Sequence, residues 1–256
     1  MKTRAAILRS FPAERPYAAS RPLAIETVTL ADPGPGEVLV RITVAGLCHS
    51  DLSVINGDRP RPMPMALGHE AAAVVERAGP GVDDLKPGDA VAMVFVPSCG
   101  CCGPCAEGRP ALCEPGAAAN GAGTLLSGAR RITLDGQPVH HHVGVSAFAD
   151  HAVVSRRSLV RVPQGLPPQI AALFGCAVLT GVGAAVNTAR VSPGETVAVV
   201  GLGGVGMSAI LGALAAGAGD VIALDVNRAK LDAAMAMGAT AAFDAADPDC
   251  AASVRA

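Results

Sequence analysis

The sequence contains few aromatic residues and no basic run, and both absences restrict the kinds of partner that the protein can have. Tryptophan is missing, tyrosine occurs once, and aromatic residues make up 2% of the chain, which favours an aliphatic binding pocket. The formal net charge is -2, so the chain lacks the basic surface with which proteins bind nucleic acid or anionic membranes. We therefore expect a small-molecule partner, with no nucleic acid and no membrane.

We also expect no hydrophobic segment long enough to span a membrane. Near the start, only residues 5–8 are apolar between Arg4 and Arg9, whereas the apolar part of a signal peptide has roughly 7–15 residues. The uncharged run of small residues from Met207 to Gly219 is interrupted by glycines and is shorter than the ~18 residues of a membrane span. We expect a cytoplasmic protein, whose eight cysteines stay reduced and available for metal binding.

Short strands separated by glycine and proline turns dominate the first part of the sequence. Hydrophobic residues make up 50% of the chain and charged residues 16%, so it can bury the cores of one or two domains. Residues 37–44 alternate apolar and polar side chains almost strictly, as a strand with one buried face does. The strands indicate a β-barrel-like domain, and we expect them at residues 2–8, 23–30, 37–44, 71–76, 90–96, 148–154 and 159–163.

Four cysteines lie close together after these first strands. Cys99, Cys102 and Cys105 are each separated by two residues, and Cys113 follows after a short polar connection. The glycines and the proline between them let the backbone turn tightly, and four thiolates at this spacing can hold a structural zinc ion. A disulfide knot or separate reduced thiols are the alternatives, although disulfide-dense scaffolds are short secreted domains. Cys101 falls between the expected ligands and should be unligated, unless it replaces Cys102.

A second group of possible metal ligands is spread along the chain. Cys48, His69 and Cys176 would together supply two thiolates and one imidazole. Three protein ligands with one open position are typical of catalytic zinc. Each of these residues taken alone could be an ordinary core residue, since free cysteine is among the most buried residue types. Their combination with the cysteine cluster favours the metal.

The segment 116–143 is rich in glycine and weakly periodic, which predicts a loop. It contains His140, His141 and His142. Three adjacent histidines can bind a metal ion at a surface, but neighbours in sequence do not converge on one ion without a special backbone, so we assign them no metal. Further on, residues 170–173 and the small residues up to Ala189 predict helix.

From Gly194 onward the pattern changes to that of a parallel sheet. The apolar segment 196–200 reads as a fully buried strand and runs directly into the glycine turn 201–206, which a helix of small residues follows. The glycines of this turn fit the G-x-G-x-x-G pattern. Between a strand and a helix, that pattern brings the pyrophosphate of a dinucleotide to bare backbone N–H groups at the start of the helix.

Asp225 ends the next expected strand, at residues 221–224, close to the position at which an acidic residue accepts hydrogen bonds from the ribose hydroxyls. A carboxylate there repels a 2′-phosphate, so the sequence favours NAD over NADP. Arg228 and Lys230 lie close enough in sequence to soften this repulsion, which makes the preference a moderate one.

In the order and spacing of these motifs, essentially the whole chain resembles the zinc-dependent medium-chain alcohol dehydrogenases. The residues that carry the likeness are Cys48-His49-Ser50-Asp51, Gly68-His69-Glu70, the four-cysteine lobe, Cys176 and the turn from Gly201 to Gly206. The length of the segment between Cys113 and Val154 is similar to that of the liver-type and glutathione-dependent formaldehyde dehydrogenase branch.

The resemblance implies an α/β plus β architecture. A GroES-like β-barrel catalytic domain would span residues 1–185, with its structural zinc lobe at about 97–115. The first half of a Rossmann NAD-binding domain, a doubly wound parallel sheet, would follow at 186–256, and the active site would lie in the cleft between the two domains.

The resemblance also implies a reaction, with two zinc ions per chain and NAD. The catalytic ion, on Cys48, His69 and Cys176, would bind the substrate alcohol, whose hydroxyl loses several pKa units on zinc. The resulting alkoxide would pass its hydride to the nicotinamide and leave as an aldehyde or ketone. The structural ion would be held by Cys99, Cys102, Cys105 and Cys113.

Further roles follow from the same resemblance. Ser50 is similar to the family hydroxyl that takes the alcohol proton, Asp51 to the carboxylate that orients His69, and Glu70 to the carboxylate near the zinc. Ser50 and Asp51 could otherwise be a turn hydroxyl and a helix N-cap. The positions expected to contact the coenzyme or the substrate are His49 at the pyrophosphate, Thr180 at the nicotinamide, Phe95 in the substrate pocket, and Gly201, Gly203, Val205, Gly206, Asp225 and Lys230 around the adenosine half.

Two features depart from the resemblance. Ser53 occupies the position at which liver-type relatives carry the histidine that ends the proton relay, so protons would leave through water, His49 or another route. The sequence also stops soon after the third strand expected at 241–243, whereas a full dinucleotide-binding sheet has two halves. We therefore expect a truncated form of a longer, homodimeric enzyme.

Three alternatives to a general alcohol dehydrogenase remain open at this point. The chain could bind zinc and adenosine without transferring hydride. The complete enzyme could act specifically on S-(hydroxymethyl)glutathione. A redox-sensing thiol protein, based on Cys101 and the cysteine lobe, is the third.

Overall fold

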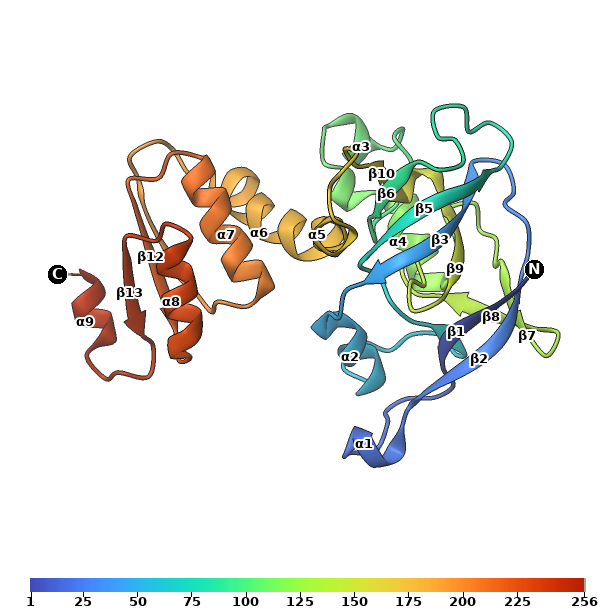
Figure 1. The fold of residues 1–256 in the computed structure, drawn as a ribbon, viewed down its shortest axis with the longest axis horizontal. Helices are drawn as coiled ribbons and strands as arrows, with labels where there is room; N and C mark the ends of the chain where they lie inside the picture. Colours follow the sequence, from blue (N-terminus) through green and yellow to red (C-terminus); the bar gives the residue numbers. More distant parts are fainter. Residues whose placement is uncertain (256) are drawn as a thin grey trace. The chain divides into compact units, whose positions relative to one another are not determined.

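The computed structural model describes residues 1–255, and the chain forms two compact units, Met1–Gly175 and Cys176–Ala256 (Figure 1). We expect the domain boundary at residue 185, whereas the first unit ends at Gly175. The boundary falls inside one helical run, Pro168–Ala189, so no break in the helix marks it. Ala256, the last residue of the expected second domain, lies outside the described residues.

The first unit contains a closed barrel with the strand order β1-β2-β7-β8-β4. Its strands pair antiparallel except for β4 and β8, which are parallel. Buried aliphatic side chains, including Ile7, Val28 and Leu30, fill its interior. The strand bounds are β1 Lys2–Leu8, β2 Leu23–Leu30, β4 Met65–Ala66, β7 Ile132–Leu134 and β8 Gln137–His141.

A second, antiparallel sheet of the first unit has the order β10-β6-β5-β3-β9. The strand β3 is an inner strand and pairs with β5 on one side and with the edge strand β9 on the other. Val38, Val40, Val91 and Met93 are fully buried in the core of this sheet. The bounds are β3 Glu37–Ala45, β5 Ala71–Ala78, β6 Ala90–Met93, β9 His151–Ser155 and β10 Leu159–Arg161.

The expected strands of the first unit are all present; β1 and β2 have the expected bounds, and the ends of β3, β5, β6, β9 and β10 are shifted. The loop predicted for residues 116–143 is wrong, because this segment contains most of the helix α4 (Glu114–Ala122) and the strands β7 and β8. Proline in its first turn and Gly123 in the left-handed conformation at its end bound α4, as is usual for a helix. The two strands pair with each other across Asp135-Gly136, both at positive φ as in a type I′ hairpin turn, and this local signal was overlooked. β7 also pairs with β2, and β8 with β4.

Short helices complete the first unit: α1 Tyr17–Ser20, α2 His49–Ile55, α3 Gly103–Ala106, the 3₁₀ turns Pro110–Leu112 and Arg156–Ser158, and α5 Pro168–Leu173. The helical run that begins with α5 continues as a π-helical segment Phe174–Val178, α6 Leu179–Gly183 and a second π-helical segment Ala184–Ala189. Such π segments inside helices occur frequently at functional sites.

The expectation that no segment reaches the length of a membrane span is wrong, because the helical run 168–189 is the one helix within residues 1–255 that is long and apolar enough to cross a membrane, with a mean hydropathy of 1.9 over its most apolar window. A core helix of a globular protein passes the same test. Ala171 and Ala172 at its start are buried against Ala72 of β5, so at least this end is a packing helix.

The second unit contains a parallel sheet with the order β11-β12-β13, as the sequence predicts. Gly181 of α6 and Gly212 of α7 let these two helices approach closely, since a Cβ at Gly181 would overlap the carbonyl oxygen of Val205. The bounds are β11 Thr196–Val200, α7 Gly204–Ala215, β12 Asp220–Asp225, α8 Arg228–Ala236, β13 Ala241–Asp244 and α9 Cys250–Arg255.

Candidate metal centre and nucleotide-binding turn

The sulfur atoms of Cys99, Cys102, Cys105 and Cys113 lie within 4.8 Å of one another. All four cysteines are free thiols, so the disulfide alternative finds no support in the structure. Cys101 is exposed, stands outside this group and has its Sγ 3.7 Å from that of Cys99. We call residues 99–113 the cysteine lobe.

Backbone N–H groups of the same segment point at the sulfurs of the cysteine lobe. Cys99 Sγ accepts from the N–H groups of Cys101 and Cys102 at 3.4 and 3.3 Å, and these bonds lower the pKa of the Cys99 thiol to about 6. Cys113 Sγ accepts from Cys99 and Gly116 at 3.1 and 3.3 Å. Burial raises the pKa of the Cys105 thiol to about 12, and the neighbouring sulfurs add to this effect. Because zinc binds the thiolate form, the four sulfurs give the lobe the donor set of a four-cysteine zinc site.

Sheet pairing brings Cys48 and His69 together. Ala45 at the end of β3 pairs with Ala71 at the start of β5, and the N–H of Gly46 donates to the carbonyl of Glu70 at 2.8 Å. The residues just after β3 and just before β5 therefore adjoin, although about twenty residues separate them in sequence.

The third possible ligand, Cys176, follows Gly175 on the helical run that begins in the first unit. Gly175 lies so close to the end of β6 that a Cβ would overlap the carbonyl oxygen of Met93. One ligand atom each from Cys48, His69 and Cys176 lies within 4.8 Å of the other two. This set fits zinc with an open position.

The carboxylate of Asp51, in the first turn of α2, lies at the Nδ1 side of the His69 ring. Its Oδ2 is 2.9 Å from His69 Nδ1, and its Oδ1 accepts from the N–H of Gly68 at 3.0 Å. Gly68 has φ of +92°, and a Cβ there would run into the backbone of Phe148, so only glycine suits this position. An ionised carboxylate only accepts hydrogen bonds, so His69 carries its proton on Nδ1, and Nε2 is the nitrogen that can bind a metal ion.

Charges shift the pKa values of this pair in opposite directions. Burial favours the neutral acid at Asp51, but hydrogen bonds from His142 and His69 outweigh it and hold the pKa of Asp51 well below its usual range. Burial disfavours the charged imidazolium at His69, yet the neighbouring Asp51 and Cys48 outweigh that effect and raise the pKa of His69. The carboxylate is therefore ionised at neutral pH.

Other predicted residues have varied surroundings. Glu70 is buried, Ser50 is half-buried, and His49 and Thr180 are exposed. The ring of Phe95 meets that of His69 edge to face, with the centroids 5.6 Å apart.

The glycine turn of the second unit has the backbone that its sequence predicts. Gly201 has φ of +88°, and Gly203 is the N-cap of α7. Gly206 is the glycine of close packing, since a Cβ there would overlap the carbonyl oxygen of Gly201. Val205 on the first turn of α7 is exposed. This geometry leaves the N-terminus of α7 open to a phosphate group.

Asp225 at the end of β12 anchors the glycine turn. The N–H of Leu202 donates to its Oδ2 at 2.7 Å, and the N–H of Asn227 donates to its Oδ1 at 2.9 Å. These backbone bonds lower the pKa of Asp225. Lys230 Nζ is 3.5 Å from the same Oδ2, whereas Arg228 pairs with Asp232 on its own helix.

His142 is a residue of the site that sequence reasoning missed. It follows β8 and is buried, with its Nδ1 3.1 Å from Asp51 Oδ1 and its ring perpendicular to that of His69 at 5.5 Å between centroids. No local signal points to His142, because strand alternation continued from buried His141 would place it on the outer face with half-exposed His140, whereas it is buried just after β8 ends.

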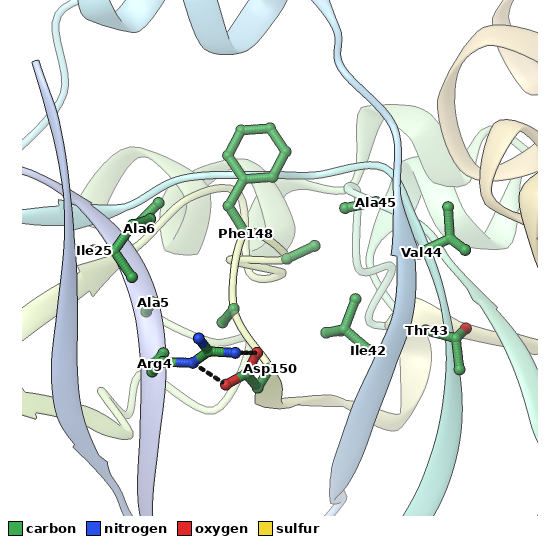
Figure 2. A pocket seen from close by; sticks show the side chains of 12 residues that line it. Arg4, Ala5, Ala6, Ile25, Ile42, Thr43, Val44, Ala45, Phe148 and Asp150 are labelled. Atoms are coloured by element: carbon green, nitrogen blue, oxygen red, sulfur yellow. Dashed lines mark hydrogen bonds and ion pairs between the residues drawn. The ribbon is translucent and has the colours of Figure 1, made fainter. Parts of the chain in front are cut away.

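An open cavity of about 480 Å³ in the first unit lies between the strands β1 and β2 and the end of β3 (Figure 2). Arg4 and Asp150 form an ion pair at one end of it, with Nε 2.8 Å from Oδ2, and Phe148 lies at the other end. None of the predicted site residues, all of which belong to the described part of the chain, lines this cavity. We therefore assign it no part in the site.

Comparison with known proteins identifies the family. Residues 34–164 match the alcohol dehydrogenase GroES-like domain. The chain belongs to this alcohol dehydrogenase family. It is 40% identical over 250 residues to an S-(hydroxymethyl)glutathione dehydrogenase of Escherichia coli O139:H28 (strain E24377A / ETEC), covering 97% of this chain and 66% of that protein.

Solved structures of the alcohol dehydrogenase family agree with the fold. An alcohol dehydrogenase zinc-binding domain protein from Burkholderia ambifaria has a TM-score of 0.91 and 36% identity, over 100% of this chain and 67% of that one. Benzyl alcohol dehydrogenase from Acinetobacter calcoaceticus has a TM-score of 0.88 and 30% identity, over the same shares of the two chains. The predicted fold class, a GroES-like barrel domain followed by Rossmann-type strands, is confirmed. The chain spans about two thirds of the length of these relatives.

Proposed function

We propose that this protein catalyses the zinc- and NAD-dependent oxidation of an alcohol to an aldehyde or ketone. The observation that carries the proposal is the meeting of Cys48, His69 and Cys176, with the Asp51 carboxylate behind His69. Membership of the alcohol dehydrogenase family and the glycine turn before α7 support it. When bound, zinc would supply a Lewis acid that lowers the pKa of the alcohol, and NAD would accept the hydride.

The residues of this chain have separable tasks in the proposed reaction. Cys48, His69 and Cys176 would hold the catalytic zinc and leave a position open for the substrate. Asp51 keeps His69 in the tautomer and orientation that a metal ligand needs. Ser50, half-buried beside Cys48, would accept the proton of the alcohol, and Glu70 would lie near the metal during ligand exchange.

Other residues would place the coenzyme and the substrate. Gly201, Gly203, Val205 and Gly206 would receive the pyrophosphate, and Asp225 and Lys230 would bind the adenosine ribose. His49 would contact the pyrophosphate, Thr180 the nicotinamide, and Phe95 would form a wall of the substrate pocket. A second zinc ion in the cysteine lobe would have a structural role only.

Two classes of alcohol are candidates for the substrate. The E. coli relative is named for S-(hydroxymethyl)glutathione, and the Acinetobacter structure for benzyl alcohol. We propose a primary or aromatic alcohol as the general substrate, with the glutathione adduct of formaldehyde as the specific alternative. Formation of NADH from benzyl alcohol, ethanol and a mixture of formaldehyde and glutathione, measured side by side, separates them.

The experiment that tests the proposed function is zinc analysis of the purified chain together with NADH formation. We expect two zinc ions per chain, and one in a Cys48→Ala variant. Two zinc ions without turnover would favour the alternative of a zinc- and adenosine-binding protein. A content of zero or one zinc ion in the unmodified chain would contradict the proposal.

For the complete protein we further propose a cytoplasmic homodimer. Sedimentation analysis of the complete protein tests this assembly, and fractionation of cells tests the location.

A further inference from the structure

The carboxylate of Asp51 is shared by more donors than one metal ligand needs. His69 Nδ1 faces its Oδ2 at 2.9 Å, while both the N–H of Gly68 and His142 Nδ1 face its Oδ1, at 3.0 and 3.1 Å. Asp51 and His142 are both buried. A buried histidine aimed at the carboxylate behind a possible metal ligand has no place in the function proposed so far.

We propose that His142 is a positioning residue of the catalytic metal site, which holds Asp51 by an Nδ1–H hydrogen bond and, through Asp51, fixes the orientation of His69. This inference rests on the proposed function, because it presupposes a metal ion on His69. It goes beyond that function in assigning a role to a residue that is not itself a ligand.

The chemistry of the groups supports this role. An ionised carboxylate offers only acceptors, so the His142 nitrogen at 3.1 Å from Asp51 Oδ1 must carry the proton. Its bond to Oδ1 leaves Oδ2 to His69 alone. Without His142, Oδ1 would keep only the backbone N–H of Gly68, and the carboxylate could rotate about its χ2 torsion. Partners of this kind behind metal ligands typically affect metal affinity about 10–100-fold.

His142 is itself held firmly enough to fix Asp51. Its backbone N–H donates to Ser146 Oγ at 3.0 Å, and its ring stands perpendicular to that of His69. The segment around it is anchored by backbone bonds, among them Val145 N–H to the carbonyl of His142 at 3.0 Å. The donor therefore belongs to the rigid part of the first unit.

A second metal position formed by Asp51, His69 and His142 is the competing interpretation, since their ligand atoms lie within 4.8 Å of one another. Ligand atoms around tetrahedral zinc are about 3.3 Å apart, which follows from bonds of about 2.0–2.1 Å. The separations of 2.9 and 3.1 Å between the Asp51 oxygens and the two Nδ1 atoms are shorter than this and lie in the range of hydrogen-bond distances, although neither Nδ1 is aligned for a full hydrogen bond. The geometry thus favours a network without its own metal ion.

The test compares His142→Phe, His142→Asn and the control His140→Phe. Phenylalanine keeps a ring against His69 but has no N–H donor, whereas the amide nitrogen of asparagine can occupy the place of Nδ1. His140 bonds instead to the carbonyl of Ala122 at 3.2 Å, so its replacement removes a neighbouring imidazole without touching Asp51. Thermal unfolding of each variant checks that it folds.

The readouts are the rate of zinc release to a chelator and the absorption spectrum after Co²⁺ replaces zinc at the Cys48 site. We expect release from this site to be about tenfold or more faster in His142→Phe and within about threefold of the unmodified protein in His142→Asn. The cobalt bands should shift in the phenylalanine variant and return in the asparagine variant. Zinc in the cysteine lobe is the internal control and should be released at the same rate throughout.

The outcomes separate this inference from the proposed function. If the unmodified chain holds no metal ion at the Cys48 site, the proposed function itself fails. If it holds that ion but release and spectrum are unchanged in His142→Phe, the role of His142 is disproved while the function stands. A third metal ion that disappears with His142 would also overturn the inference, because Asp51 and His142 would then be ligands.

Discussion

The cysteine lobe and the Cys48 group use the same kind of ligand but are built in different ways. The four sulfurs of the lobe come from one short segment, which also supplies N–H donors to Cys99 and Cys113. Cys48, His69 and Cys176 come from three separate segments, and the pairing of β3 with β5 brings the first two together. A local site carries its own support, whereas an assembled site depends on the fold and on partners such as Asp51.

Of the substitutions that compare the two metal sites, one in the cysteine lobe should lower stability the most. In Cys113→Ser, one zinc ion per chain should be lost and the melting temperature should fall by about 10 °C or more, since structural zinc contributes directly to folding. Calorimetry with zinc analysis measures both. Cys101→Ser changes a thiol of the same loop outside the four-sulfur group, and unchanged zinc there is the control. A stable, zinc-free Cys113→Ser protein would show that the lobe does not need its metal.

The glycine turn is a second local motif, and substitutions of its individual glycines should affect stability and NAD affinity differently. In Gly206→Ala, the new Cβ overlaps the carbonyl of Gly201, so we expect a loss of about 3 kcal/mol or more in the free energy of unfolding, at the upper end of overpacking effects. In Gly203→Ala, the Cβ meets no described atom within 4 Å, so stability should hold while NAD affinity falls. Urea unfolding and calorimetric titration with NAD test this. Equal stability of the two variants would contradict the packing argument.

The three adjacent histidines, 140–142, also depend on the fold, which leaves His140 half-exposed and buries His141 and His142. Burial lowers the pKa of His141 to about 4, well below the value of about 6.5 expected in the unfolded chain. The unfolded state then binds more protons, so stability is full above pH 6.5 and should fall by ~3 kcal/mol as the pH drops to about 4. His141→Gln should lack this part of the pH dependence, which chemical unfolding at several pH values measures. An identical pH profile in the variant would rule out His141 as its source.

The smallest effect is expected at the partner of the assembled site. Asp51→Asn keeps the shape of the side chain but removes the charge that His69 and His142 face. Zinc affinity at the Cys48 site should fall about 10–100-fold, or roughly 1.4–2.8 kcal/mol, while the lobe keeps its zinc. Competition with a metal indicator measures the affinities. A parallel loss at the lobe would mean that the variant disturbs the whole first unit.

The same contrast explains how far the sequence alone leads. The spacing of the four cysteines and the strand before Gly201 are local signals, and the structure places both motifs as those signals indicate. The strands β7 and β8 were missed although Asp135-Gly136 between them is a hairpin signal, because both strands are short and the glycine content of the segment favoured a loop. His142 was missed for a different reason, since its partner Asp51 lies about ninety residues away and only the closed barrel brings them together.

The position of β3 between β5 and β9 predicts how fast its amides exchange with solvent. Its residues 38–41 are bonded to strands on both sides, to β5 and to β9, and amides of such a strand exchange only when much of a domain opens. The pairing with β9 ends at Arg41, whereas that with β5 continues to Ala45, just before Cys48. Deuterium should therefore enter the chain between Val44 and Cys48 long before it enters Val38 and Val40.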